Sequence, residues 1–306
     1  TRAAGLSAVA SPGRSDIQGV GFFIRRLTGA SNPMSEQVAA HYTHGSLMES
    51  ILEKLQEAGV ALDGLSALDL APMDHLHGRG RAATDDMIAH LRPQAGQSII
   101  DIGCGVGGPA RYIAERHGAE VTGIDLTAEF IEVAAELARL TGLSDKAHFK
   151  QANALDLPFE DATFDAGFTQ NVSMSVPDKA QFFAEAARVL KPGARFVAGE
   201  VAQGPGGDVI YPVPWAMTVE ISHLTPPDET TDILEKAGFR VEEVHDSTEH
   251  ALAYNQAARE RAKGKTPPVL TPLIILRDRG MERMRNSARN LEQGRAIPVE
   301  FVCIRA

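Results

Sequence analysis

The chain has few cysteines and no long apolar run. Cys104 and Cys303 are the only cysteines among its 306 residues, so the sequence contains neither a disulfide framework nor a CxxC metal motif. This cysteine usage is typical of a reduced, cytoplasmic protein. No apolar run approaches the roughly 20 residues that a membrane-spanning helix needs. We therefore expect a soluble protein without a membrane span.

Positive charge is also scarce. Lys and Arg number 30 against 40 Asp and Glu, which gives a formal net charge of -10. A chain of this sign would bind nucleic acid only through a segregated basic face, and the sequence contains no dense run of Lys and Arg. We expect a small molecule, and no nucleic acid, as the partner. A homo-oligomer is compatible with the sequence, which does not fix the oligomeric state.

The first part of the chain differs in composition from the rest. Residues 1–33 do not begin with methionine, are rich in Gly, Ser and Arg, and contain Asp16 as their one acidic residue. This composition predicts a leader, either a transit peptide or an added segment before a start at Met34. Apolar residues at helical spacing then predict a helical extension or lid over residues 34–91.

Strands and helices alternate from Gln97 onward. The strands are expected at 97–102, 120–124, 147–151, 164–169 and 194–201, with two later strands at 239–246 and 297–306. Alternating units of this kind predict an α/β fold, a Rossmann-like doubly wound sheet of seven mostly parallel strands with an antiparallel last strand. We assign residues 92–306 to this domain, with insertions that cover the substrate at about 202–225 and 248–293.

A glycine-rich turn follows the first strand. In "IIDIGCGVGG", Gly103, Gly105 and Gly108 have the G-x-G-x-x-G spacing that lets a backbone approach a ligand closely. Asp125 lies about 20 residues further on, at the end of the second strand, where an acid binds a ribose diol. Together they predict a site for an adenosine-containing cofactor. They do not distinguish a nicotinamide dinucleotide from other such cofactors.

Four segments taken together indicate the cofactor more specifically than the glycine turn and Asp125 alone. "IIDIGCGVGG", "VTGIDLT", "ANALDLPFEDATFD" and "ARVLKPGARF" resemble the class I S-adenosylmethionine-dependent methyltransferases in their order and spacing, roughly from Arg92 to Val201. An acid two positions before the first glycine is not expected in a nicotinamide enzyme. The resemblance implies S-adenosyl-L-methionine as the cofactor, S-adenosyl-L-homocysteine as its product, and methyltransferase activity.

The resemblance also implies a set of cofactor-binding residues, namely Asp101, Gly103, Cys104, Gly105, Asp125, Leu126, Asn153, Ala154 and Gln170. In this arrangement Asp101 lies near the methionine amino group, Asp125 binds both ribose hydroxyls and Gln170 reaches toward the methionine. Asn153 stands where the family usually has an acid. Its amide oxygen can still accept a hydrogen bond from the adenine amine. Cys104 is interpreted as a small turn residue, not as a reactive thiol.

Methyl transfer from a sulfonium needs an aligned nucleophile and a dry site, and a general base where the acceptor arrives protonated. The predicted catalytic residues are His77, Gln170 and Tyr42. Further candidates for the substrate pocket are His41, His75, Asn171, Met174, Trp215 and His223. No metal site is predicted.

The acceptor is predicted from the overall plan of the chain, which is similar to glycine, sarcosine and dimethylglycine N-methyltransferases and also to quinone and tocopherol methyltransferases. We favour a small amine or amino acid, whose carboxylate could bind Arg79, Arg81, Arg283 or Arg285. The alternative is C- or O-methylation of a hydrophobic aromatic or prenylated metabolite, for which the apolar segment 267–276 could line a groove. In a third interpretation, the chain binds the cofactor without turning it over.

Overall fold

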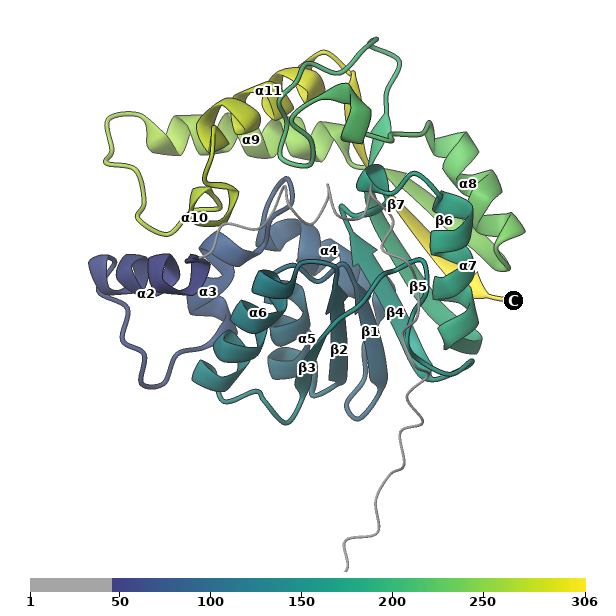
Figure 1. The fold of residues 1–306 in the computed structure, drawn as a ribbon. Coiled ribbons are helices and arrows are strands. Elements are labelled where there is room, and N and C mark those ends of the chain that lie inside the picture. Colours follow the sequence, from purple (N-terminus) through teal and green to yellow (C-terminus); the bar gives the residue numbers. More distant parts are fainter. Residues whose placement is uncertain (1–45) are drawn as a thin grey trace, which may run out of the picture. The chain divides into compact units, whose positions relative to one another are not determined.

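The computed structural model describes residues 46–306. Within that range, seven strands form one sheet in the order β3-β2-β1-β4-β5-β7-β6 (Figure 1). The strands are β1 (Ser98–Ile102), β2 (Glu120–Asp125), β3 (Ala147–Gln151), β4 (Phe164–Gln170), β5 (Leu190–Gln203), β6 (Phe239–Asp246) and β7 (Ala296–Arg305). Strand β7 is antiparallel to both β5 and β6, and the other pairs are parallel. The predicted fold class is confirmed, with the last strand inserted between β5 and β6.

Helices cover both faces of this sheet. They are α2 (Leu47–Glu57), α3 (Ala67–Asp74), α4 (Arg81–Leu91), α5 (Gly108–His117), α6 (Ala128–Leu140), α7 (Lys179–Val189), α8 (Pro227–Lys236), α9 (Thr248–Ala262), α10 (Leu273–Leu276) and α11 (Gly280–Glu292), with short 3-10 turns η1 (Ser173–Ser175) and η2 (Val219–Ile221). Helix α4 packs on β4, β5 and β7, so part of the predicted N-terminal extension forms a layer of the domain itself. None of the described helices is long and apolar enough to cross a membrane.

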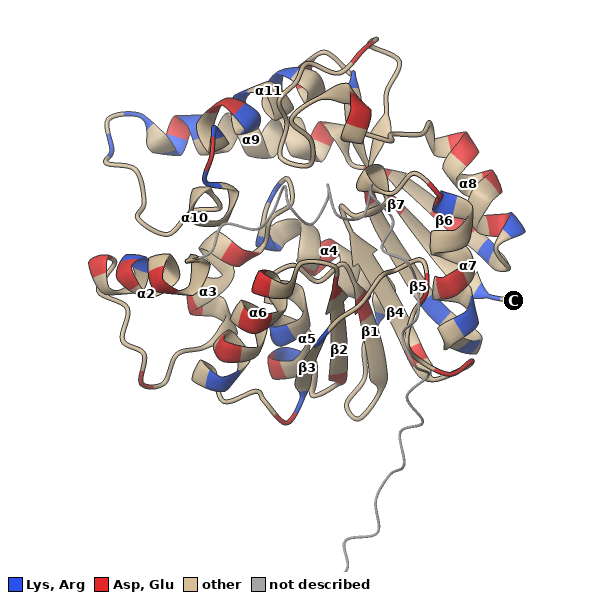
Figure 2. Cartoon of the chain, viewed as in Figure 1, with Lys and Arg blue, Asp and Glu red and all other residues tan. Residues whose placement is uncertain are grey.

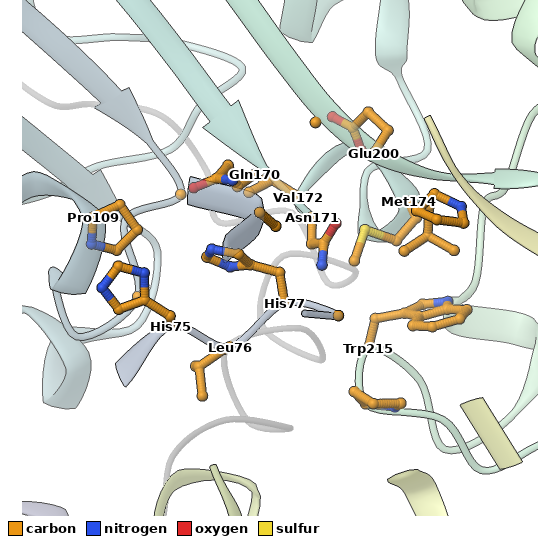
Figure 3. A pocket seen from close by; sticks show the side chains of 18 of the residues that line it. His75, Leu76, His77, Pro109, Gln170, Asn171, Val172, Met174, Glu200 and Trp215 are labelled. Carbon is orange, nitrogen blue, oxygen red and sulfur yellow. The ribbon is translucent and has the colours of Figure 1, made fainter. Parts of the chain in front are cut away.

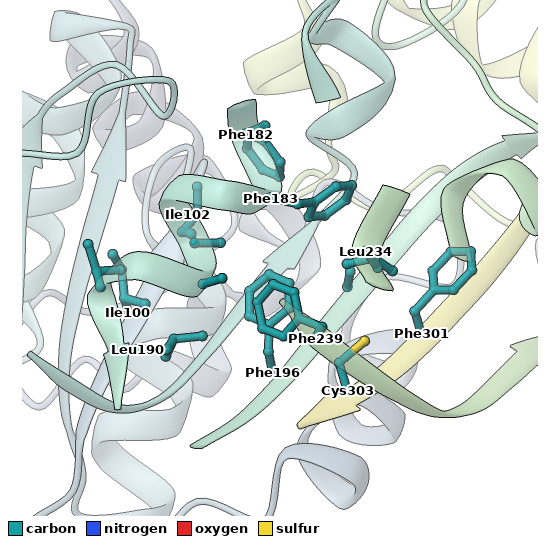
Figure 4. Close-up of a cluster of buried hydrophobic side chains, with 14 of the residues drawn as sticks. Ile100, Ile102, Phe182, Phe183, Leu190, Phe196, Leu234, Phe239, Phe301 and Cys303 are labelled. Carbon is teal, nitrogen blue, oxygen red and sulfur yellow. The ribbon is translucent and has the colours of Figure 1, made fainter. Parts of the chain in front are cut away.

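The alternation of strand side chains separates two cores. Ile99 packs with α4 and α5, whereas its neighbour Ile100 packs with α7 on the opposite face. Figure 4 shows this second core, in which Phe182 and Phe183 lie near Phe196. Because consecutive residues of a strand point to opposite faces, a continuous apolar run is what a sheet covered on both sides requires.

Local signals account for some of the boundaries. Asp178 accepts a hydrogen bond from the Gln181 N–H at 3.0 Å and begins α7, as its position predicts. Thr127 precedes α6 but makes no such side-chain bond, and its own N–H donates to Asp125. The predicted turn "KPGA" lies inside β5, where the pairing with β4 shifts register around Gly193.

Charges lie mainly on the outer helices, where Lys and Arg stand beside Asp and Glu (Figure 2). Several form pairs one turn apart, as in Lys54–Glu57, Glu136–Arg139, Glu260–Lys263 and Arg279–Glu282. Exposed pairs of this kind contribute about 0–1 kcal/mol each to stability. The fold therefore depends mainly on its buried hydrophobic cores.

Candidate active site

A cavity of about 930 Å³ lies at the carboxyl ends of β1, β2, β4 and β5. Its other walls come from the loop after α3, from the segment around Trp215 and from α9, α10 and α11. In open α/β sheets, ligands bind at this edge, and small-molecule sites are typically roughly 300–1,000 Å³. This cavity is at the upper end of that range.

The predicted cofactor residues all line this one cavity: Asp101, Gly103, Cys104, Gly105, Asp125, Leu126, Asn153, Ala154 and Gln170. Gly103 and Gly105 have φ angles of 81° and 53°, which favour glycine. A Cβ on Gly103 would also lie 2.3 Å from Cγ2 of Val172. The turn thus has its glycines where the backbone must turn tightly under a ligand.

Asp125 is held in place by the backbone around it. Its Oδ2 accepts a hydrogen bond from the Gly105 N–H and its Oδ1 accepts one from the Thr127 N–H, both at 2.9 Å. A carboxylate accepts about four hydrogen bonds, so each oxygen keeps capacity for a hydroxyl donor. This geometry fits the predicted contact with a ribose diol.

Asp101 is a buried carboxyl, and its Oδ2 has no hydrogen-bond partner in the described part of the chain. Burial, reinforced by the nearby charge of Asp125, raises its pKa well above the ordinary value. A cationic ligand would compensate for this burial. The site therefore fits a ligand that brings positive charge to the end of β1.

Two residues of the turn have structural roles. A Cβ on Gly108 would lie 2.6 Å from the backbone oxygen of Asp74, so α5 starts in direct contact with the end of α3. This agrees with a glycine that permits close packing. Burial raises the pKa of the Cys104 thiol well above its ordinary value, which favours the neutral, unreactive form.

His75 and His77 meet at the hydroxyl of Thr84. Thr84 Oγ1 lies 2.8 Å from both His75 Nδ1 and His77 Nε2, and 3.4 Å from Oε1 of Gln170. Burial lowers the pKa of His75 to about 4 and that of His77 to about 3. Both rings are neutral at neutral pH. His77, predicted as a catalytic residue, is thus placed on the cavity as a hydrogen-bonding group and as a weak base.

Glu200 on β5 was not among the residues predicted from the sequence. Its side chain is buried, and neither carboxylate oxygen makes a hydrogen bond within the described residues. Burial raises its pKa to about 7. The charge of Lys179 acts in the opposite direction, as do the hydroxyl and backbone N–H of Ser173 and the backbone N–H of Met174, which approach the carboxylate without reaching hydrogen-bond geometry. One signal was available in the sequence: an acid inside the apolar run "RFVAGEVA".

Glu300 of β7 is a second acid on the cavity wall that the sequence did not reveal. Its Oε1 is paired with Nδ1 of His90, whose ring stacks on that of His245 with 4.4 Å between the ring centroids. Burial raises the pKa of Glu300, and the hydrogen bond from His90 opposes this effect. Glu300 therefore already has a partner, unlike Glu200.

The remaining predicted residues have different placements. Figure 3 shows Asn171 and Met174 on the cavity wall with Trp215, whose Nε1 donates to Ser222 Oγ at 2.9 Å. His223 is not on that wall, and its backbone N–H donates to the Met174 carbonyl at 2.7 Å. His41 and Tyr42 lie outside the described residues.

The arginines predicted to bind an acceptor carboxylate have other partners. Arg79 pairs with Asp86 at 2.5 Å, and Arg81 pairs with Asp85 at 2.8 Å. Arg283 is buried and donates to backbone carbonyls, among them that of Leu276 at 3.0 Å. Arg285 donates to the Met281 carbonyl at 3.2 Å, and neither Arg283 nor Arg285 is on the cavity wall. Among residues 46–306, no three or more His, Cys, Asp and Glu side chains are grouped so as to hold a metal ion.

Comparison with known proteins points to one family. Residues 100–198 match a family described as "Methyltransferase domain". The chain is 33% identical over 187 residues to the methyltransferase GfsG of Streptomyces halstedii, covering 59% of this chain and 66% of the relative. It is 29% identical over 228 residues to an O-methyltransferase of Pyrenophora dematioidea (73% and 83%), and 42% identical over 116 residues to a probable tocopherol O-methyltransferase of Oryza sativa (38% and 31%). The chain thus spans less than two thirds of the length of GfsG and of the Oryza protein.

Solved structures share the fold. A geranyl diphosphate C-methyltransferase from Streptomyces coelicolor A3(2) superposes with a TM-score of 0.64 at 20% identity, covering 90% of this chain and 99% of that one. The phosphoethanolamine N-methyltransferase 2 of Haemonchus contortus gives a TM-score of 0.63 at 16% identity, covering 88% and 60%. Residues 100–198 thus match a methyltransferase domain, and the relatives support the predicted class I S-adenosylmethionine-dependent methyltransferase. A nicotinamide dinucleotide is thereby set aside as the cofactor.

Proposed function

We propose that this chain transfers a methyl group from S-adenosyl-L-methionine to an oxygen or carbon of a mostly apolar small molecule, and that Glu200 is the general base. The observation that carries the proposal is the position of Glu200, a buried carboxyl without a hydrogen-bond partner on the same cavity as the glycine turn. A group of this kind is unfavourable for stability, and such groups are concentrated at functional sites.

The cofactor would be held by three groups of the chain. Asp101 would accept from the methionine ammonium, the backbone at Gly105 would pass beneath the cofactor, and Asp125 would accept from both ribose hydroxyls. When bound, the cofactor supplies an electrophilic methyl group on a sulfonium. The unpartnered Asp101 oxygen and the remaining capacity of Asp125 support this assignment.

Glu200 is suited to remove the acceptor's proton. Its pKa of about 7 means that a substantial fraction is ionised at neutral pH while the carboxylate keeps appreciable basicity. The carboxylate would accept the proton that the acceptor loses as its oxygen or carbon forms the new bond to the methyl group. His77, with a pKa near 3, is a much weaker base at the same pH.

The cavity walls favour an apolar acceptor. The lining includes the apolar side chains of Met174, Trp215, Leu276, Met284 and Leu291. Arg79 and Arg81 pair with acids, and Arg259, the other arginine on the described cavity wall, pairs with Glu292 at 2.5 Å. A zwitterionic amino acid would therefore find no ready partner for its carboxylate. We therefore place C- or O-methylation of a hydrophobic metabolite ahead of N-methylation of sarcosine or dimethylglycine.

One observation favours an amine as a second candidate. Glu200 and Glu300 both face the cavity, and two acids would stabilise a cationic amine that carries no carboxylate of its own. Of the small amines and amino acids favoured by the sequence, an amine without a carboxylate is therefore the better candidate for N-methylation.

The test is methyl transfer from labelled S-adenosyl-L-methionine to a panel containing a prenylated phenol, a simple phenol, a small amine and sarcosine. We expect label in the apolar phenols and none in sarcosine. Glu200→Gln should lower kcat by about 10²- to 10⁴-fold, whereas Glu242→Gln, on the exposed part of β6, should not. Label in sarcosine alone would contradict the proposal, and cofactor binding without transfer to any acceptor would support the non-catalytic alternative.

We also propose the cytoplasm as the setting of this reaction. Both cysteines, Cys104 and Cys303, are free and buried, as a reducing compartment allows. Fractionation of the cells that make the protein tests this, and recovery from an oxidising compartment would contradict it.

A further inference from the structure

We propose that Thr84 is a positioning residue that fixes the ring tautomers of His75 and His77, so that His77 offers its Nδ1 lone pair to an N–H or O–H of the acceptor. The proposal rests on the proposed function, because it specifies a feature of the acceptor bound in the same cavity. Thr84 belongs to α4 and is not among the residues that the sequence singled out.

The geometry converges on one hydroxyl. Thr84 is completely buried, and its Oγ1 lies 2.8 Å from a ring nitrogen of His75 and 2.8 Å from one of His77. The third contact, 3.4 Å, is with Oε1 of Gln170 at the end of β4. Thr84 therefore links the loop after α3 to the strand whose end lines the cavity.

Counting protons assigns the donors. A hydroxyl has one hydrogen and two lone pairs, whereas the oxygen of a glutamine amide can only accept. All three contacts are satisfied only when Thr84 donates to Gln170 and accepts from both imidazoles. His75 is then protonated at Nδ1 and His77 at Nε2, and each ring is neutral.

The surrounding charges are consistent with neutral rings. Burial is the largest cause that lowers the pKa of both histidines, and Arg79 adds to it at His77 as Arg111 does at His75. The opposing charge of Asp85 at His75 is smaller. A neutral pair is also appropriate beside a sulfonium ligand, since a second cation would repel it.

The consequence is a polar contact for the acceptor. With Nε2 of His77 committed to Thr84, Nδ1 carries the free lone pair, and the hydrogen bond that the His77 ring makes within the described residues is the one through Nε2. His77 lies on the cavity wall together with Gln170 and Asn171 (Figure 3). An acceptor with an N–H or O–H donor would satisfy this nitrogen, while one without a donor would leave it unpaired.

The first experiment needs no acceptor. Long-range ¹H–¹⁵N NMR of the histidine rings, assigned with single His→Gln variants, reports which ring nitrogen carries the proton. In the wild type we expect Nδ1–H at His75 and Nε2–H at His77. In Thr84→Val, His75 should move to the Nε2–H form, because Nε2 faces Asp74 Oδ1 at 3.8 Å. Unchanged tautomers in this variant would overturn the proposal.

The second experiment measures turnover. Thr84→Val should lower kcat/KM for the acceptor by on the order of 10- to 100-fold, while the affinity for S-adenosyl-L-homocysteine stays unchanged. Thr84→Ser should restore most of the activity because it keeps the hydroxyl. The matched control is Thr230→Val, which removes another buried hydroxyl, bonded to Thr225 at 2.8 Å and outside the cavity. Equal losses in the Val and Ser variants would overturn the proposal.

A third variant covers the case in which Thr84→Val does not fold. Gln170→Leu removes the group to which Thr84 donates, so the released hydroxyl proton should give mixed tautomers at His75 and His77. Unmixed tautomers in Gln170→Leu would contradict the assignment. If the wild type methylates no acceptor, the proposed function fails, whereas the NMR result still decides the role of Thr84.

Discussion

Arg111 and Asp74 form an ion pair of 2.7 Å in which both side chains are buried. The same guanidinium donates to the carbonyl of Val106 in the glycine turn, also at 2.7 Å, and to that of Ala134 in α6. One side chain thus joins the cofactor turn to the end of α3, where the loop carrying His75 begins. We therefore expect this pair to hold the glycine turn and the loop carrying His75 in position relative to each other.

Replacing one partner of this pair should lower the free energy of unfolding more than replacing both partners. Arg111→Met should lower the free energy of unfolding by about 3–5 kcal/mol, because Asp74 is left charged and buried without a partner. The double variant Arg111→Met/Asp74→Leu should lose less free energy of unfolding than the single variant Arg111→Met. Urea denaturation measures both. Arg139→Met, which breaks an exposed pair, should leave the free energy of unfolding nearly unchanged. A double variant less stable than the single one would contradict this interpretation.

Asp101 should make cofactor binding depend on pH. Its raised pKa leaves it more protonated in the free protein, and a cationic ligand favours the carboxylate, so binding releases a proton and affinity rises with pH. Asp101→Asn should weaken S-adenosyl-L-methionine binding by about 10- to 100-fold, the equivalent of one charged hydrogen bond. Calorimetry in buffers of different ionisation enthalpy detects the proton. Equal proton release by the wild type and Asp101→Asn would show that another group is responsible.

Glu200 should destabilise the fold at high pH. Its pKa of about 7 in the folded state lies above the ordinary 4.5, so the folded state binds the proton more tightly. This stabilisation is fully present below pH 4.5 and is lost as pH rises through 7, a difference of about 3 kcal/mol. Glu200→Gln should therefore match the wild type at acidic pH and exceed it by about 3 kcal/mol at pH 9 in urea denaturation. A stability difference independent of pH would contradict the burial of an unpaired acid.

Gly108 should tolerate no side chain. Gly108→Ala places a Cβ against the Asp74 backbone and should cost about 1–3 kcal/mol through overpacking. Gly78 is the matched control, because it has an ordinary φ and no atom within 4 Å of its Cβ position. Thermal unfolding of Gly108→Ala and Gly78→Ala separates the two, and equal melting temperatures would show that α5 can shift away from α3.

Features set by short stretches of chain were predictable from the sequence. The order of strands and helices, the turn at Gly103 and Gly105 and the acid at Asp125 follow from apolar periodicity and glycine chemistry, which are properties of neighbouring residues. The assignments fail where longer-range pairing intervenes. The segment "KPGA" has the composition of a turn, yet it lies inside β5, where Leu190 before it and Arg195 after it both pair with β4.

Other features arise only when distant segments come together. The insertion of β7 between β5 and β6 depends on which strand edges are left unpaired, and no local pattern encodes that choice. The contacts of Thr84 with His77 and Gln170 exist only because α4 packs beside both residues. The sequence by itself determined which edge of the sheet carries the residues predicted to bind the cofactor. The tertiary structure decided which acid could act as a base, because the pKa of Glu200 is set by what surrounds it and excludes water from it.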